Sequence, residues 1–244
     1  KNVLLGLICI SRYELVNVES YKFKKLRELA DRVAVALSNA ESEEKLYKQA
    51  HYDLLTSIPN RFLFKKRVVS AIESAKINKH YIAVMFVDID RFKKVNDSLG
   101  HTVGDTLIRE IAKLLLNCVG NNDTVARFGG DEFLIVIPDI RNSELASKQA
   151  TKIAGKSLKH ISKPFIINNR EIYISASIGI TLFPDDGDNY DDILKNADTA
   201  MYKAKMLGRN NFQFFNIKED KITSNKLNFE NHLRHAIEKN ELTL

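Results

Sequence analysis

The hydrophobic positions along the chain predict one long helix followed by alternating strands and helices. Between Phe23 and Ala50, apolar residues recur at steps of three and four. This spacing predicts a helix of about 30 residues with one apolar stripe. The stripe must be buried against a second copy of the helix or against the rest of an upstream domain. Residues 2–12 are predicted to form a strand, and residues 226–244 an amphipathic helix.

The segment 81–87 is almost continuously apolar, which predicts a central strand covered on both faces. A helical pattern begins after Pro59 and continues to about Ile77. Two further strands flank Gly129-Gly130, which predicts a tight hairpin at this pair of glycines. Pro138 is predicted to end the second strand of the hairpin.

The rest of the pattern predicts a short helix, a glycine break and several more elements. These are helices at about 103–117, 143–160 and 190–207, strands at 164–167 and 172–180 around Asn168-Asn169, and a closing strand at 212–215.

Carboxylates are predicted to lie where strands of the sheet end. Asp131 and Glu132 directly follow the two glycines of the hairpin. Adjacent carboxylates repel each other unless a cation neutralises them, and Mg²⁺ with an attached phosphate is a common reason for such a pair. A solvated turn with two surface acids explains the pair about equally well.

The central strand also ends in acids, Asp88 and Asp90, on one face. A buried carboxylate at a strand end is costly unless it is paired or bound to metal, so we assign Asp88 to metal binding. Asp90 precedes the helical pattern that begins at Arg91, and we assign it largely to capping that helix.

The composition indicates a soluble globular class, with 44% hydrophobic and 28% charged residues. No apolar run approaches the ~20 residues of a membrane span. Cys9 and Cys118 lie in apolar sequence and are predicted to be buried thiols in a reducing cytoplasm. The first residue, Lys1, and the lack of a signal peptide suggest a fragment of a longer protein. The net charge is +6, but the basic residues are spread along helices, which favours a small polyanion over nucleic acid as the partner.

Four separated motifs resemble the GGDEF family of diguanylate cyclases and occur in the family's order over roughly residues 51–216. They are the segment from Asp53 to Arg61, the segment from Phe92 to Asp105, the segment from Arg127 to Phe133, and the segment from Ala197 to Asn210.

The resemblance implies an α/β (α+β) fold with a mostly antiparallel central sheet flanked by helices, close to the nucleotidyl cyclase and polymerase-palm arrangement. It implies condensation of two GTP molecules into cyclic di-GMP with release of pyrophosphate. Two Mg²⁺ ions, or Mn²⁺, would be held by Asp88, the Ile89 carbonyl, Asp131 and Glu132, the last two being catalytic. Because one domain holds one GTP and the product is two-fold symmetric, catalysis requires a homodimer.

The resemblance also implies how GTP is bound. Asn96 and Asp105 would converge on guanine, because a carboxylate can accept from N1–H and the 2-amino group while an amide donates to a ring acceptor. Taken singly, either residue is more often a helix cap. The remaining implied contacts are Phe92, Lys93, Gly129 and Gly130 through their backbone, and Lys205 and Arg209 toward the phosphates. A lysine near a helix end also commonly complements the helix dipole.

The flanking segments resemble parts of other domains. Residues 1–50 resemble the end of a GAF-type sensor domain with a signalling helix, residues 51–216 form the GGDEF domain, and residues 217–244 resemble a linker and the start of an EAL phosphodiesterase domain. This leaves open a catalytically silent GTP-binding module that controls a downstream phosphodiesterase. A purely structural α/β interaction domain would require four motifs to coincide.

Many GGDEF domains carry an inhibitory product site with an Arg-x-x-Asp motif. In this chain the register places Asp123 at the aspartate and Gly120 at the arginine. An arginine fork makes charge-assisted bonds worth ~1.5–3 kcal/mol each. We therefore expect no product inhibition through this site, and partial restoration by Gly120→Arg. For Asp123, local sequence alone favours a plain turn residue.

Overall fold

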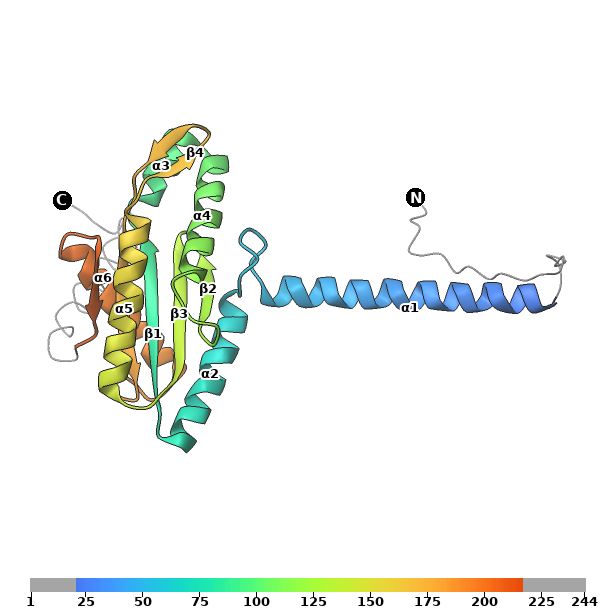
Figure 1. Ribbon diagram of the computed structural model, residues 1–244, viewed down its shortest axis with the longest axis horizontal. Coiled ribbons are helices and arrows are strands. Elements are labelled where there is room, and N and C mark those ends of the chain that lie inside the picture. The colour runs from blue at the N-terminus through green and yellow to red at the C-terminus, as the bar shows by residue number, and fades with distance from the viewer. Residues whose placement is uncertain (1–20, 217–244) are drawn as a thin grey trace, which may run out of the picture. The chain divides into compact units, whose positions relative to one another are not determined.

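The computed structural model describes residues 21–216, which fall into two units (Figure 1). One unit ends at His51 and the other begins at Tyr52. The strand predicted at 2–12, the helix predicted at 226–244, Cys9 and the GAF-like and EAL-like resemblances of the two ends lie outside the described residues.

The first unit contains the long helix α1, Tyr21–His51, which confirms the predicted helix. Its large apolar side chains are exposed, with Val33 40% and Leu46 65% accessible. The predicted stripe therefore has no cover among the residues that the structure describes. No helix within 21–216 is long and apolar enough to cross a membrane.

The second unit is built on a five-stranded sheet of order β2-β3-β1-β6-β7, antiparallel except for the parallel pair β6–β7. This confirms the predicted mostly antiparallel sheet. The strands are β1 Tyr81–Ile89, β2 Thr124–Gly129, β3 Glu132–Ile140, β4 Phe165–Ile167, β5 Arg170–Ile172, β6 Ala176–Phe183 and β7 Asn211–Phe214. The helices are α2 Arg61–Asn78, α3 Phe92–Leu99, α4 His101–Leu116, α5 Ser143–Ile161 and α6 Tyr190–Met206.

Strand β1 lies in the middle of the sheet and is covered on both faces, as its sequence predicts. Met85 and Val87 pack in one core with α4 and α5. Val84 and Phe86 point the other way and pack in a second core with α2 and α6. By this alternation the side chain of Asp88 belongs to the α2–α6 face. Cys118 is a buried free thiol, as predicted.

Two strand predictions are wrong in detail. Pro138 does not end β3, because the strand continues to Ile140 through a bulge that places Pro138 and Asp139 opposite Ile82. A bulge tolerates a residue without an N–H group. The strand predicted at 172–180 is divided, since β5 ends at Ile172 and pairs only with β4, whereas β6 begins at Ala176 and joins the main sheet.

The predicted glycine break between two helices is present at Gly100, which has φ +85° and separates α3 from α4. Gly104, four residues later, lies inside α4.

Candidate active site

The site begins where β1 ends beside the turn between β2 and β3. Asp88 pairs with Glu132 in the register of the two strands. The Ile89 N–H donates to the Asp131 carbonyl over 3.2 Å. Residues predicted to hold metal from two distant parts of the sequence are thus neighbours in the fold.

The turn differs slightly from the predicted one. Gly129 is still paired with Glu132, so Gly130 and Asp131 form the two-residue loop, with Gly130 at φ +51°. A methyl group added at either glycine would meet nothing within 4 Å. The backbone of this turn is therefore open on its outer side, where a ligand can approach.

Helix α6 completes the site from the α2–α6 face of the sheet. At Gly179 of β6, an added Cβ would lie 1.9 Å from the Ala197 carbonyl oxygen and 2.2 Å from the Met201 nitrogen. The helix backbone therefore packs directly on the strand there. This contact holds α6, with Asp198 and Lys205, against the sheet, and the Lys205 Nζ lies 2.7 Å from Asp88 Oδ2.

Asp88, Asp131, Glu132 and Asp198 form a cluster of carboxylates with too little positive charge nearby to neutralise them. Burial raises the pKa of Asp88 even though Lys205 acts against it, and nearby Asp131 adds to the rise. Burial, followed by the negative charges of Asp88, Asp198 and Asp131, raises the pKa of Glu132 to about 7. Burial also raises the pKa of Asp198, against the effect of Lys205. Such mutual repulsion favours a cation among these groups.

Sequence reasoning missed Asp198 as a member of this cluster. Its signal was present, because Asp198 directly follows Ala197 on the apolar face of α6, where a carboxylate is unexpected. Its neighbours Ala197, Thr199 and Ala200 are buried, whereas Asp198 is half-buried.

The donors suit a hard divalent cation, because Mg²⁺ prefers carboxylate and carbonyl oxygen. In the arrangement seen here, however, no three His, Cys, Asp or Glu side chains within 21–216 converge closely enough to hold a metal ion. The one cation bound at Asp88 is the ammonium group of Lys205. The residues therefore fit the metal by chemistry, while their side chains are not yet arranged around one.

Asp90 does not cap α3, so this prediction is wrong. The N-cap of α3 is Arg91, at φ 59°, and no side chain caps it. Instead, the Asp90 carboxylate accepts hydrogen bonds from the Ser175 hydroxyl at 2.6 Å, the Ser177 hydroxyl at 2.7 Å and the Asn210 backbone at 3.2 Å. Asp90 thus joins the end of β1 to β6 and to the loop before β7, a structural role of another kind.

The two residues predicted to bind guanine lie on the two helices of the α3–α4 corner, Asn96 on α3 and Asp105 on α4. A Cβ added at Gly104 would lie 1.9 Å from Asn96 Oδ1 and 3.1 Å from the Phe92 ring. The Asn96 amide therefore lies directly over Gly104, the residue before Asp105. Lys93 is exposed beside Phe92 at the start of α3. Asp105 itself is exposed in the first turns of α4, and its pairing with Asn96 on guanine stays a prediction.

The two predicted phosphate contacts both lie near carboxylates. Lys205 is bonded to Asp88, and Arg209 Nε lies 3.9 Å from Asp90 Oδ1, with 45% of the arginine side chain exposed. Both cations are thus placed at the end of β1, where their charges are available to an anion.

The turn is held by Arg127, whose role sequence reasoning did not identify. Its Nε and Nη2 donate to the Gly130 carbonyl at 3.0 and 2.7 Å, and its Nη1 donates to Asp53 at 3.1 Å. Burial acts to raise the pKa of Asp53, but hydrogen bonds from Thr56 and the Arg127 guanidinium outweigh it and keep this pKa below its usual value. The first and third motifs are thus joined by one ion pair that fixes the turn.

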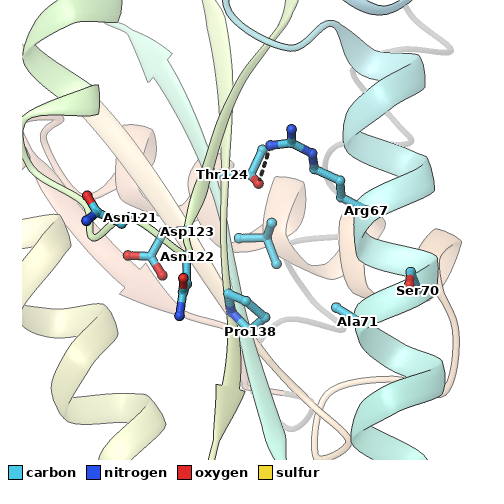
Figure 2. A pocket seen from close by; sticks show the side chains of 9 residues that line it. Arg67, Ser70, Ala71, Asn121, Asn122, Asp123, Thr124 and Pro138 are labelled. Atoms are coloured by element: carbon cyan, nitrogen blue, oxygen red, sulfur yellow. Dashed lines mark hydrogen bonds between the residues drawn. The ribbon is translucent and has the colours of Figure 1, made fainter.

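The Gly120–Asp123 turn lies away from this cluster, beside a cavity of about 380 Å³ between α2 and the β2–β3 pair (Figure 2). The Gly120 N–H donates to Asp123 Oδ2 at 2.7 Å, which is a turn role. Burial raises the pKa of Asp123, although this hydrogen bond acts against it. Figure 2 also shows Arg67 reaching from α2 to the Thr124 hydroxyl, at 2.9 Å. The cavity therefore has a guanidinium from another element, and the absence of product inhibition stays a prediction.

Residues 50–211 match the family described as diguanylate cyclase, GGDEF domain. The chain is 37% identical over 242 residues to the bifunctional diguanylate cyclase/cyclic di-GMP phosphodiesterase MucR of Pseudomonas aeruginosa, covering 99% of this chain and 34% of that protein. It is 34% identical over 199 residues to the cyclic di-GMP phosphodiesterase NbdA of the same organism, covering 82% and 25%. The chain thus spans about a third of the length of MucR and a quarter of the length of NbdA.

A solved structure of the GGDEF domain of TpbB from Pseudomonas aeruginosa is similar as well. It has a TM-score of 0.67 and 34% identity, and the match covers 71% of this chain and 99% of that one. The family match over residues 50–211 includes all four motifs described above.

Proposed function

Because this chain belongs to the GGDEF family of diguanylate cyclases, we propose that its α/β unit condenses two GTP molecules into cyclic di-GMP. The 3′-hydroxyl oxygen of each GTP forms a bond to the α-phosphorus of the other, the hydroxyl proton is lost, and pyrophosphate leaves. The cluster of Asp88, Asp131, Glu132 and Asp198 carries this proposal, because carboxylates that raise one another's pKa by repulsion suit divalent cations that bind a triphosphate.

Asp88, the Ile89 carbonyl, Asp131 and Glu132 would hold two Mg²⁺ ions, with Mn²⁺ as a possible replacement. Ions bound there neutralise charge on the attacked phosphate and help ionise the attacking hydroxyl. The open backbone at Gly130 and its neighbour Gly129 admits the nucleotide close to these carboxylates.

The chain's other residues position the nucleotide. Asn96 and Asp105 bind the guanine edge, supported by the close packing of Asn96 on Gly104. Backbone N–H groups at Phe92 and Lys93, in the first turn of α3, donate to the terminal phosphates. Lys205 and Arg209 add positive charge on the same side.

Catalysis requires two such units facing each other, because each supplies one GTP to a two-fold symmetric product. The exposed apolar residues of α1 support a homodimer, since a stripe such as Val33 and Leu37 is buried when two copies of the helix pair.

A second candidate function is a silent GTP-binding module that regulates a phosphodiesterase in a longer protein. The similarity to NbdA, which is named a phosphodiesterase, favours it. None of the residues assigned to the metals or to guanine is replaced, and this favours the cyclase.

The deciding experiment incubates the protein with GTP and Mg²⁺ at concentrations that span its dimerisation, and measures cyclic di-GMP by chromatography. We expect product whose rate per subunit rises with dimer formation. GTP binding without product at full dimerisation would establish the silent module. No Mg²⁺-dependent GTP binding at all would contradict both functions.

Asp105→Ala tests the base assignment in the same assay. It should raise the KM for GTP by about tenfold and reduce discrimination against ATP, because the N1–H and 2-amino donors of guanine lose their acceptor. Unchanged affinities for GTP and ATP would remove Asp105 from the guanine site.

A further inference from the structure

Lys205 occupies an oxygen of Asp88, a residue that we assign to metal binding. Its Nζ lies 2.7 Å from Asp88 Oδ2, and the two side chains are only 26% and 11% exposed. Its charge also lowers the pKa of Glu132 and of Asp198, against the larger effect of burial at both. The positive charge of one ammonium group thus acts on carboxylates from β1, β3 and α6.

The lysine is well suited to leave this position. Its compact ammonium group is carried on a flexible four-carbon chain, so it can move without displacing the helix. The helix itself is fixed, because α6 packs on Gly179 with no room for a side chain. The mobile part of this contact is therefore the Lys205 side chain alone.

An ammonium group and a divalent cation compete for the same carboxylate. Both approach it within about 3 Å, and their like charges repel strongly at that separation. Phosphate groups are stronger attractants for an ammonium group than one carboxylate, since they carry more charge.

We propose that Lys205 occupies Asp88 while the nucleotide is absent, and that the nucleotide phosphates draw it away so that a divalent cation binds Asp88 more tightly once GTP is bound. This inference rests on the proposed function, because it assumes that the site takes metal and GTP. Lys205 is then a positioning residue that couples the two binding events, and the coupling acts equally in both directions.

The test measures Mn²⁺ binding to the nucleotide-free protein by the electron paramagnetic resonance signal of free Mn²⁺. Lys205→Met should bind Mn²⁺ about tenfold more tightly than the wild type, because a competing charge is removed. Lys205→Arg keeps the charge and should stay near the wild type. Lys195→Met is the matched control, since Lys195 is an exposed lysine on the same helix, about 15 Å away by helix rise.

A second measurement distinguishes displacement of the lysine from a general effect of its charge. A non-hydrolysable GTP analogue should tighten Mn²⁺ binding more in the wild type than in Lys205→Met, because only the wild type has a lysine to displace. The inference is overturned if the GTP analogue tightens Mn²⁺ binding equally in the two proteins. It is also overturned if, without nucleotide, Lys205→Met binds Mn²⁺ no more tightly than the wild type, or if neither protein binds Mn²⁺.

GTP turnover by the wild type, measured in parallel, tells the two failures apart. Turnover with unaltered Mn²⁺ affinity in Lys205→Met refutes the lysine inference and leaves the proposed function intact. Absence of GTP binding by the wild type refutes the proposed function and with it the inference.

Discussion

Asp88 and Asp90 lie two residues apart at the end of the same strand, yet their surroundings differ in kind. Asp90 is 4% exposed and accepts hydrogen bonds from the hydroxyls of Ser175 and Ser177 and from the Asn210 backbone. Asp88 is 8% exposed and forms an ion pair with Lys205, while the negative charges of Asp131 and Asp90 lie nearby.

The difference separates a structural carboxylate from a functional one. Donors from the start of β6 and from the loop before β7 satisfy the charge of Asp90 whenever the protein is folded. Burial of Asp88 outweighs its ion pair with Lys205 and raises its pKa, so its charged form is disfavoured until a stronger cation arrives. Burial alone would not distinguish them, because both are buried.

The largest effect is expected from removing the charge at Asp88. Asp88→Asn should lower GTP turnover by about 10³-fold, because a metal ligand is lost from the reacting groups. Its unfolding midpoint in urea, with EDTA present, should be unchanged or higher. Asp131→Ala should behave in the same way. Near wild-type turnover in either variant would remove that residue from the metal site.

The matched change at Asp90 should act on stability instead. Asp90→Asn should lower the free energy of unfolding by about 2–4 kcal/mol, because charge-assisted bonds to buried hydroxyls are lost. Urea denaturation in the same EDTA buffer measures it against Asp88→Asn. Equal stability of the two variants would erase the distinction between the two sites.

Glu132 should make the stability of the metal-free protein depend on pH. Its pKa is about 7 in the folded protein against an ordinary 4.5, so the folded state holds its proton more tightly than the unfolded state. The unfolding free energy should therefore fall as pH rises from about 4.5 through 7, by about 2 kcal/mol after allowance for solvent screening. Urea titrations in EDTA at pH 5.5 and 8 should show a smaller fall in Glu132→Gln, and an identical fall would contradict the assignment.

The smallest effect is expected from a buried hydroxyl without a partner. Ser157 Oγ on α5 makes no hydrogen bond within the part of the chain that the structure describes, whereas Ser177 Oγ donates to Asp90. Ser157→Ala should change stability by less than about 1 kcal/mol and in the stabilising direction, while Ser177→Ala should destabilise by about 1–3 kcal/mol. Thermal melts of both variants test the pair, and equal losses would show that Ser157 has a partner.

Local patterns in the sequence were sufficient for most of the elements. The long helix, the buried central strand and the hairpin all follow from residue spacing that acts over a few positions. The end of β3 and the division between β5 and β6 did not, because a bulge at Pro138 and the choice of sheet depend on partner strands far away in the chain.

The sequence by itself determined that acids lie at strand ends and that four motifs carry the family resemblance. Only the tertiary structure decided what each acid does, because the partners of Asp88 and Asp90 come from α6, from the start of β6 and from the loop before β7, some 85 to 120 residues further along. The same holds for Asp198 and Arg127, whose places depend on close packing at Gly179 and on an ion pair to Asp53. A carboxylate's role follows from which donors the fold brings to it, and residue spacing along one element does not contain that information.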